Sequence, residues 1–336
     1  MTSSPEPRVA LCRGESRATN LRSALDLVLD DIDWFTRRHV VVKPNLVMVE
    51  RAHAITHRDA LAAVLEAIRC RYTGLLTIAE GCALHPTTEA FDAQGYDQLA
   101  AFYNAQLCDL NADEVEPVTV YSRDAHLLKL RMARTILQSD CRVSLGLPKT
   151  HDTVLVTLTI KNMIMGSLVN RRLTGCHGKP AWLDRIGQIA RGHGDGWGSD
   201  KVAMHQSYPI INLNLALLAP LVLPHLSVLD GFVAMEGAGP VEGTPVAWGI
   251  ALAGTDALAV DTLAARLMGF DLSEIGYLSY CAELGLGCAV LEQIQVVGNV
   301  ALESVARSFT PHPRHTEQRR WQRLDAPALL QRAATA

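Results

Sequence analysis

The sequence predicts an α/β protein in which a mainly parallel, open sheet is flanked by helices. Short apolar runs rich in β-branched residues alternate with amphipathic segments, which is typical of parallel strands joined by crossover helices. The runs are followed by polar residues, as expected of buried strands that end near a ligand. The pattern is compatible with one open sheet or with two α/β lobes that have a cleft between them.

The first half of the chain supplies three of the expected strands. The run 40–42 predicts a buried strand, and the apolar spacing over 57–70 predicts a helix. The runs 75–79 and 141–147 predict two further strands. Residues 107–131 are punctuated by Asn, Asp and Pro and predict short strands or loops.

The second half keeps the alternation around one irregular insertion. Residues 157–169 form a compact apolar segment that is interrupted by Lys161 and Asn162. The predicted order beyond the insertion is a helix, two strands, a helix and a last strand, at 207–218, 226–229, 249–253, 256–268 and 294–297. We expect an N-terminal lobe over 1–140, a second lobe over 141–300 with a Gly- and His-rich insertion at 170–206, and a peripheral tail over 301–336.

Composition favours a cytoplasmic protein with a small-molecule ligand. The chain has 336 residues, a net charge of −4 and a pI near 6.3, so it has no basic field to attract nucleic acid or an anionic membrane. The apolar stretch 210–223 is interrupted by Asn212, Asn214 and Pro220 and is too short to span a bilayer. The first residues lack the apolar region of a signal peptide. Association into a homo-oligomer is compatible with the sequence.

Motifs for the common cofactors are missing from the sequence. The eight cysteines include no CxxC pair, so no iron–sulfur cluster is predicted. Residues 237–243 are glycine-rich but do not match GxGxxG, and Pro240 has no N–H to offer a phosphate, so no standard nucleotide motif is present. The cofactor is left open, with a divalent metal as one option.

Polar residues follow five of the predicted strands. They are Lys43 and Asn45, Glu80, Lys149 and His151, Asp230, and Asp256. Because the carboxyl ends of parallel strands meet at one edge of a sheet, we expect these side chains to share a ligand site. The alternative is that each one is an ordinary polar loop residue.

Two charged residues in apolar segments strengthen this hypothesis. Lys161, next to Asn162, either reaches solvent or lies in a cleft, where desolvation would lower its pKa toward that of a general base or an imine-forming amine. Asp261 falls on an apolar helix face and needs a partner, either a ligand or one of the lysines in a structural salt bridge.

Histidines add a candidate metal site. The candidate ligands are His151, His177 and His205, with Glu80 or Asp230 as an additional carboxylate. Their spacing matches no compact metal motif, and each histidine could instead be a surface or capping residue.

Several short motifs occur in a fixed order along the chain. They are 42–46 (VKPNL), 79–81 (AEG), 95–96 (GY), 148–151 (PKTH), 160–163 (IKNM), 230–231 (DG), 235–240 (MEGAGP), 254–256 (GTD) and 260–261 (VD). In these motifs the chain, over about residues 9–298, resembles the uncharacterised family catalogued as domain of unknown function 362. The resemblance implies that the strand-end residues belong together, and the MEGAGP motif adds Glu236 and Gly239 as substrate-binding candidates.

The same resemblance suggests two further comparisons. Some relatives carry ferredoxin-like segments with cysteine-bound iron–sulfur clusters, which hints at redox chemistry, but this chain lacks those cysteines. A faint analogy to the nickel-dependent lactate racemase group, whose sites use lysine and histidine between two α/β lobes, is a fold-level alternative.

Three functions fit these residues. The first is an enzyme acting on a small anionic or carbonyl-bearing molecule by proton transfer, isomerisation or oxidation. Its expected catalytic residues are Lys161, His151, Lys149, Glu80 and Asp261, and its expected substrate-binding residues are Lys43, Asn45, Asn162, Asp230, Glu236, Gly239 and Asp256. The second is a metal-dependent or cofactor-free oxidoreductase or oxygenase of a biosynthetic pathway, and the third is a non-catalytic anion-binding protein.

Overall fold

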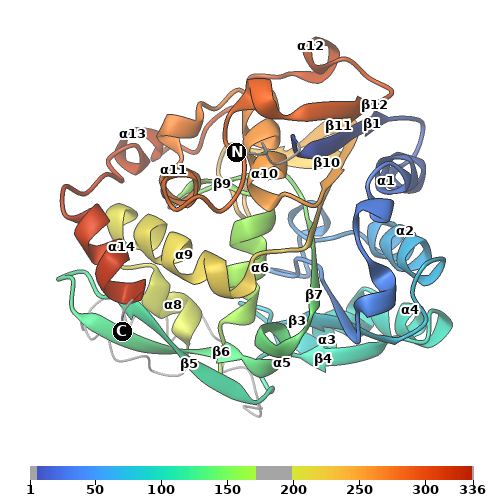
Figure 1. Ribbon diagram of the computed structural model, residues 1–336, viewed down its shortest axis with the longest axis horizontal. Coiled ribbons are helices and arrows are strands. Elements are labelled where there is room, and N and C mark those ends of the chain that lie inside the picture. Colours follow the sequence, from blue (N-terminus) through green and yellow to red (C-terminus); the bar gives the residue numbers. More distant parts are fainter. Residues whose placement is uncertain (1–5, 172–198, 335–336) are drawn as a thin grey trace.

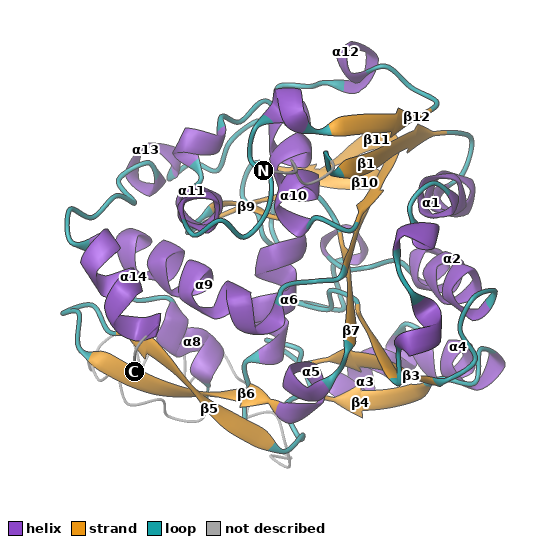
Figure 2. Ribbon diagram, in the orientation of Figure 1, coloured by secondary structure: helices purple, strands orange, loops and turns teal. Residues whose placement is uncertain are grey.

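Most of the described strands form one large sheet that has helices on both faces (Figure 1, Figure 2). The computed structural model describes residues 6–171 and 199–334. Within these ranges the sheet contains β1 (Arg8–Arg13), β2 (His39–Lys43), β3 (Leu75–Glu80), β4 (Gln106–Asp109), β7 (Cys141–Gly146), β8 (Lys149–His151), β9 (Leu155–Thr157), β10 (Leu226–Glu236), β11 (Thr244–Gly254) and β12 (Gln295–Gly298). A separate hairpin consists of β5 (Val115–Tyr121) and β6 (Leu127–Ala133).

The sheet is mainly parallel, which confirms the predicted fold class. Its main path has the strand order β12-β1-β11-β10-β7-β2-β3-β4, and the neighbours from β10 to β4 are all parallel. Strand β11 runs antiparallel to both β1 and β10. The carboxyl ends of β2, β3, β7 and the first part of β10 therefore lie at one edge, while β11 ends at the opposite edge.

Helices cover the two faces in two groups. The described helices are α1 (Arg17–Asp26), α2 (Arg58–Arg69), α3 (Thr87–Ala93), α4 (Tyr96–Phe102), α5 (Arg134–Gln138), α6 (Thr159–Ser167), α8 (Asp200–Met204), α9 (Tyr208–Val222), α10 (Ala257–Leu267), α11 (Gly276–Glu283), α12 (Leu302–Val305), α13 (His315–Gln318) and α14 (Ala326–Ala334). Helices α1 to α4 pack on one face, and α6, α9, α10 and α11 pack on the other.

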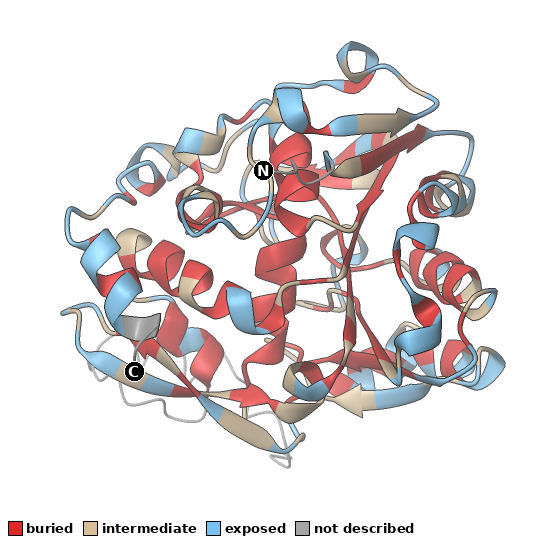
Figure 3. Ribbon diagram, viewed as in Figure 1, coloured by how far each residue is buried: buried red, intermediate tan, exposed pale blue. Residues whose placement is uncertain are grey.

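Strand β2 shows why its three central residues, 40–42, are all apolar. Val40 and Val42 belong to the hydrophobic core beneath α1 and α2, whereas Val41 belongs to the core beneath α6, α9 and α10. A strand that is buried on both faces needs no polar alternation. Figure 3 shows the same strand layer buried between its two helix layers.

The predicted strands and helices are present, but several are longer than expected. Strands β10 and β11 extend over 226–236 and 244–254, where the sequence predicted 226–229 and 249–253. Strands from both sides of residue 140 share one sheet, and the division into lobes at that position stays a prediction. Much of the insertion at 170–206 lies outside the described residues.

The C-terminal tail, expected to be peripheral, contributes buried side chains to the core. Phe309, Trp321 and Leu330 are all less than 9% exposed, and the Trp321 ring packs edge-on against Tyr280 with centroids 5.0 Å apart. None of the helices in the described ranges combines the length and apolar content needed to cross a bilayer.

Candidate functional site

Helix α6 carries two of the candidate residues, and buried charged side chains hold both of its ends. At the N-terminus, the Asp261 carboxylate accepts hydrogen bonds from the Thr159 N–H (2.9 Å), the Thr159 hydroxyl (2.6 Å) and the Ile160 N–H (3.0 Å). At the C-terminus, Lys201 Nζ donates to the carbonyls of Met165 (2.8 Å), Gly166 (3.2 Å) and Leu168. These contacts satisfy N–H groups at the start of the helix and carbonyl groups at its end, so α6 is firmly positioned.

The ends of β2 and β3 are joined by a buried ion pair. Lys43 Nζ lies 3.0 Å from Glu80 Oε2, and the two side chains are 1% and 3% exposed. The same ammonium donates to the Pro44 carbonyl (3.0 Å) and to Asn162 Oδ1 (3.2 Å). Glu80 also accepts from the N–H groups of Leu46 and Gly81, so its charge is well compensated.

Asn45 links this ion pair to a second buried lysine. Its Nδ2 donates to Asn162 Oδ1 at 2.8 Å, and its Oδ1 accepts from Lys149 Nζ at 2.9 Å. Lys149 Nζ also donates to the Ala54 carbonyl at 2.8 Å. Burial, together with the nearby Lys161 charge, lowers the pKa of Lys149 to about 7.

The third lysine, Lys161, lies against a histidine. Its Nζ is 2.9 Å from His151 Nε2, and both residues are at most 5% exposed. Burial lowers the pKa of Lys161 to about 8 and the pKa of His151 to about 3, with the Lys161 charge adding to the effect on His151. The imidazole is therefore neutral at pH 7, and Lys161 exchanges its proton near that pH.

The surroundings of His151 Nδ1 accept either neutral tautomer of the ring. The Thr153 N–H donates to Nδ1 at 3.0 Å when Nδ1 is unprotonated, and Asp152 Oδ1, also 3.0 Å away, accepts when Nδ1 carries the proton. In the first tautomer Nε2–H points at a neutral Lys161 amine, and in the second a Lys161 ammonium donates to Nε2. Lys161 can lose a proton in this arrangement without leaving a buried polar group unpaired.

We call Lys43, Asn45, Glu80, Lys149, His151, Lys161 and Asn162 the lysine cluster. It contains three buried lysines and one buried carboxylate, Glu80. The further acid next to it, Asp152, has a side chain that is 40% exposed. The cluster thus has an excess of potential positive charge that either an anion or deprotonation must balance.

The remaining candidates make their described contacts with residues that are not members of this cluster. Asp230 pairs with Arg17 at 2.6 Å, and Glu236 accepts from the Thr310 N–H at 2.9 Å. Asp256 caps α10 at the opposite edge of the sheet, because it follows the antiparallel strand β11. Gly239 lies so close to Thr150 that a Cβ would be 2.0 Å from the Thr150 carbonyl oxygen.

Asp261 also lies away from the lysines by its described contacts. Its hydrogen bonds go to the start of α6, and burial raises its pKa to about 7. These contacts favour a positioning role over the expected catalytic one and over the alternative of a salt bridge to a lysine.

The histidine candidates do not form a metal-binding group in the described part of the chain. In residues 6–171 and 199–334, no three His, Cys, Asp or Glu side chains converge as metal ligands would. The ring of His205 stacks on that of His151 with centroids 6.3 Å apart, and its Nδ1 lies 2.7 Å from the Lys201 carbonyl. His177 lies outside the described residues.

Sequence reasoning missed Lys201 and Arg17. Ser199 and Asp200 are a recognisable helix start that would have placed Lys201 in a short helix. No spacing in the sequence indicates that Lys201 reaches the end of α6, or that Arg17 in α1 reaches Asp230 in β10.

One comparison with known proteins assigns the chain to a family. The chain belongs to the family described as domain of unknown function (DUF362), whose model matches residues 40–266, more than half of its length. It is 23% identical over 293 residues to a thylakoid-associated protein of Synechocystis sp., covering 84% of this chain and 81% of that protein.

One solved structure similar to this chain is the lactate racemase apoprotein from Thermoanaerobacterium thermosaccharolyticum. The TM-score is 0.43 at 13% identity, over 83% of this chain. The chain spans 57% of that protein's length.

Proposed function

We propose that this protein is an enzyme that transfers a proton to or from a small anionic, carbonyl-bearing molecule. The observation that carries the proposal is the pairing of Lys161 with the neutral His151 inside a cluster of three buried lysines and one buried carboxylate. A buried excess of cations favours an anionic ligand, and a lysine whose pKa is about 8 is suited to acid–base work near neutral pH.

The lysines divide the work in this proposal. Lys149, assisted by Asn45, pairs with the anionic group of the substrate, and Asn45 is the partly exposed member of the cluster from which a ligand approaches. Lys43 stays paired with Glu80 and contributes positive potential. This field stabilises the enolate that forms when a proton leaves the carbon beside the carbonyl.

Lys161 is the proton acceptor. The His151 ring first exchanges its Nε2 proton for one on Nδ1 through solvent near Asp152, so that Nε2 accepts an N–H of the neutral amine and the amine lone pair is free. The lone pair then takes the proton from carbon and forms the new N–H bond, and the C–H electrons move into the enolate. Return of the proton to either face of the enolate would complete exchange or isomerisation.

Solvent deuterium exchange tests this proposal without a known substrate. A panel of 2-oxo acids, including pyruvate and 2-oxobutyrate, is incubated with the protein in D₂O, and loss of the protons beside the carbonyl is followed by NMR. We expect the wild type to accelerate exchange of at least one acid, and Lys161→Met and His151→Gln to lose at least about 100-fold of that rate, as is typical when a general base is removed.

The matched control is Lys129→Met, which removes an exposed lysine of β6. It should leave exchange unchanged, and circular dichroism should show all three variants folded. Exchange that persists in Lys161→Met refutes the role of this residue. Binding of the acids without any exchange would instead establish a non-catalytic anion-binding protein.

Reductive trapping provides an independent reading of the Lys161 pKa. At pH 8 a lysine with a pKa of about 8 is half neutral, against ~0.3% for one with a pKa of 10.5, so Lys161 has about 150 times more free amine per molecule. Glyoxylate with cyanoborohydride should therefore modify Lys161 with a midpoint near pH 8, measured by peptide mass spectrometry. Modification of Lys129 alone would contradict a reactive amine in the cluster.

A further inference from the structure

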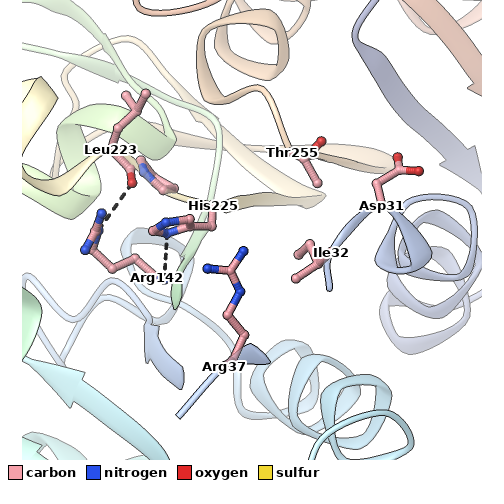
Figure 4. A pocket seen from close by; sticks show the side chains of 8 residues that line it. Asp31, Ile32, Arg37, Arg142, Leu223, His225 and Thr255 are labelled. Atoms are coloured by element: carbon pink, nitrogen blue, oxygen red, sulfur yellow. Dashed lines mark hydrogen bonds between the residues drawn. The ribbon is translucent and has the colours of Figure 1, made fainter. Parts of the chain in front are cut away.

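A second group of basic residues gathers at the sheet edge opposite the lysine cluster. Arg37 precedes β2, Arg142 is the second residue of β7, and His225 precedes β10, so all three lie at the amino ends of parallel strands. They line a pocket of about 350 Å³ together with Asp31, Ile32, Leu223, Pro224 and Thr255 (Figure 4). A pocket of this size accommodates a small molecule.

Several hydrogen-bond donors of this pocket are left over after the internal contacts are made. Arg37 Nη1 donates to the Asp140 carbonyl at 2.8 Å, while its Nε is buried and has no partner in the described part of the chain. Arg142 donates from Nε to the Leu223 carbonyl (3.3 Å) and from Nη1 to the Ser139 carbonyl (2.8 Å). Figure 4 shows the Arg37 guanidinium directed toward the space between His225 and Ile32.

His225 adds a donor whose tautomer is set by the backbone. The Arg142 N–H donates to His225 Nδ1 at 3.1 Å, so the neutral ring carries its proton on Nε2. Burial, followed by the charges of Arg142 and Arg37, lowers the pKa of His225 to about 4, whereas Asp140 acts in the opposite direction. The ring is thus a neutral N–H donor at pH 7.

The acids near the pocket are engaged elsewhere. Asp31 pairs with Arg8 at 2.9 Å. Asp140 accepts hydrogen bonds from the N–H groups of Arg38 (2.9 Å) and His39 (3.1 Å). The two guanidinium groups that line the pocket therefore face it without a dedicated carboxylate partner in the described residues.

We infer that this pocket is a second ligand site, distinct from the lysine cluster, that binds a small oxyanion such as a phosphate or carboxylate group. Arg37 offers the Nε and Nη2 edge of its guanidinium, which matches two oxygens of an oxyanion. A slight rotation of the side chain exposes the buried Nε to the ligand. His225 Nε2–H provides a further donor. The apolar wall of Ile32, Leu223 and Pro224 accommodates a small hydrocarbon body next to the anionic group.

The test uses inorganic phosphate and succinate as separate probes of the two oxyanion classes. Isothermal titration calorimetry at constant ionic strength measures their affinity for the wild type, for Arg37→Gln and for Arg38→Gln. Arg38 is the matched control, since it carries the same charge on the neighbouring residue with a side chain that is 93% exposed. We expect at least about tenfold weaker binding of the preferred probe in Arg37→Gln, as for loss of a charged hydrogen bond, and less than a twofold change in Arg38→Gln.

The lysine cluster also favours anions, so Lys149→Met decides between the two sites. Binding at the pocket should persist in that variant. Loss of binding in Lys149→Met with full binding in Arg37→Gln would overturn the inference. Absence of binding of either probe at about 10 mM, a concentration on the order of the dissociation constant of a weak metabolite site, would overturn it as well.

Histidine-selective NMR on the wild type gives a second readout that needs no variant. An anion between the guanidinium groups should shift the His225 ring signals and raise its pKa, because it offsets the charges of Arg37 and Arg142. His225 signals that do not respond to a probe that binds the protein would likewise overturn the assignment of the site.

Discussion

Replacing Gly166 by alanine tests how closely helix α6 packs on the buried ion pair. A Cβ at this position would lie 1.8 Å from Lys43 Cε, 2.0 Å from Lys43 Nζ and 2.8 Å from Glu80 Oε1. The end of a lysine usually moves aside at little cost. Here the Lys43 ammonium is held by Pro44, Glu80 and Asn162, so displacing it breaks hydrogen bonds that are buried.

Two opposing effects set the expected magnitude. Glycine to alanine inside a helix ordinarily stabilises by about 0.5–1 kcal/mol. Overpacking costs about 1–3 kcal/mol, and a buried carboxylate that loses its partner costs about 3–5 kcal/mol. Because the ammonium shifts rather than disappears, we expect Gly166→Ala to lower the free energy of unfolding by about 2–4 kcal/mol.

A change of sign makes this prediction specific. In a background with Lys43→Ala and Glu80→Ala, the obstructing atoms are gone, and the Gly166→Ala substitution should become neutral or stabilising by up to about 1 kcal/mol. Urea denaturation followed by circular dichroism measures both costs. The control is Gly146→Ala in β7, where a Cβ would meet its nearest atom, Leu229 Cδ2, at an ordinary 3.4 Å. An equal cost of Gly166→Ala in both backgrounds would refute the contact with Lys43.

Two further predictions concern the pH dependence of stability. Burial raises the pKa of Asp261 from 3.8 to about 7, so the contribution of its protonation to stability is full below pH 3.8 and is lost as the pH rises to 7. We expect Asp261→Asn to lower the free energy of unfolding by about 1–2 kcal/mol at pH 5 and by less at pH 8. An equal cost at both pH values would contradict this prediction. Burial lowers the pKa of Lys161 from 10.5 to about 8, so the wild type should gain stability relative to Lys161→Met between pH 8 and 9.5. Urea denaturation should show a gain of at most about 1.4 kcal/mol per pH unit. The opposite slope would show that the folded protein stabilises the charged lysine.

The sequence predicted that Lys43, Asn45, Glu80, Lys149 and His151 lie close together, because they follow runs that are apolar on both faces of the sheet. The runs that end at Lys43, Glu80 and Gly146 are parallel neighbours, so their ends meet as expected. The same rule placed Asp256 at the wrong edge of the sheet. An apolar run shows where a strand lies in the sequence but not whether it runs parallel or antiparallel to its neighbours. Strand β11 is antiparallel to β10, with Gly254 opposite Ser227.

The contact between Lys161 and His151 could not be read from strand ends alone. His151 does not simply follow β7; it belongs to β8, which turns back through a tight connection into β9 and on to α6. This turn directs the imidazole toward the first turn of α6. The contact between His151 and Lys161 therefore depends on where α6 packs. Asp261 and Lys201 fix the position of α6, although they are 102 and 36 residues from the α6 residues that they contact.

The buried lysines also link ligand binding to stability. Burial disfavours the charge of three lysines and lowers the pKa of each: Lys149, Lys161 and Lys201. Keeping these side chains charged at neutral pH therefore costs the folded protein stability. An anion that enters the lysine cluster relieves this cost and must, by linkage, raise the pKa of Lys149 and Lys161. Binding of an anion at pH 8 to 9 should therefore take up protons.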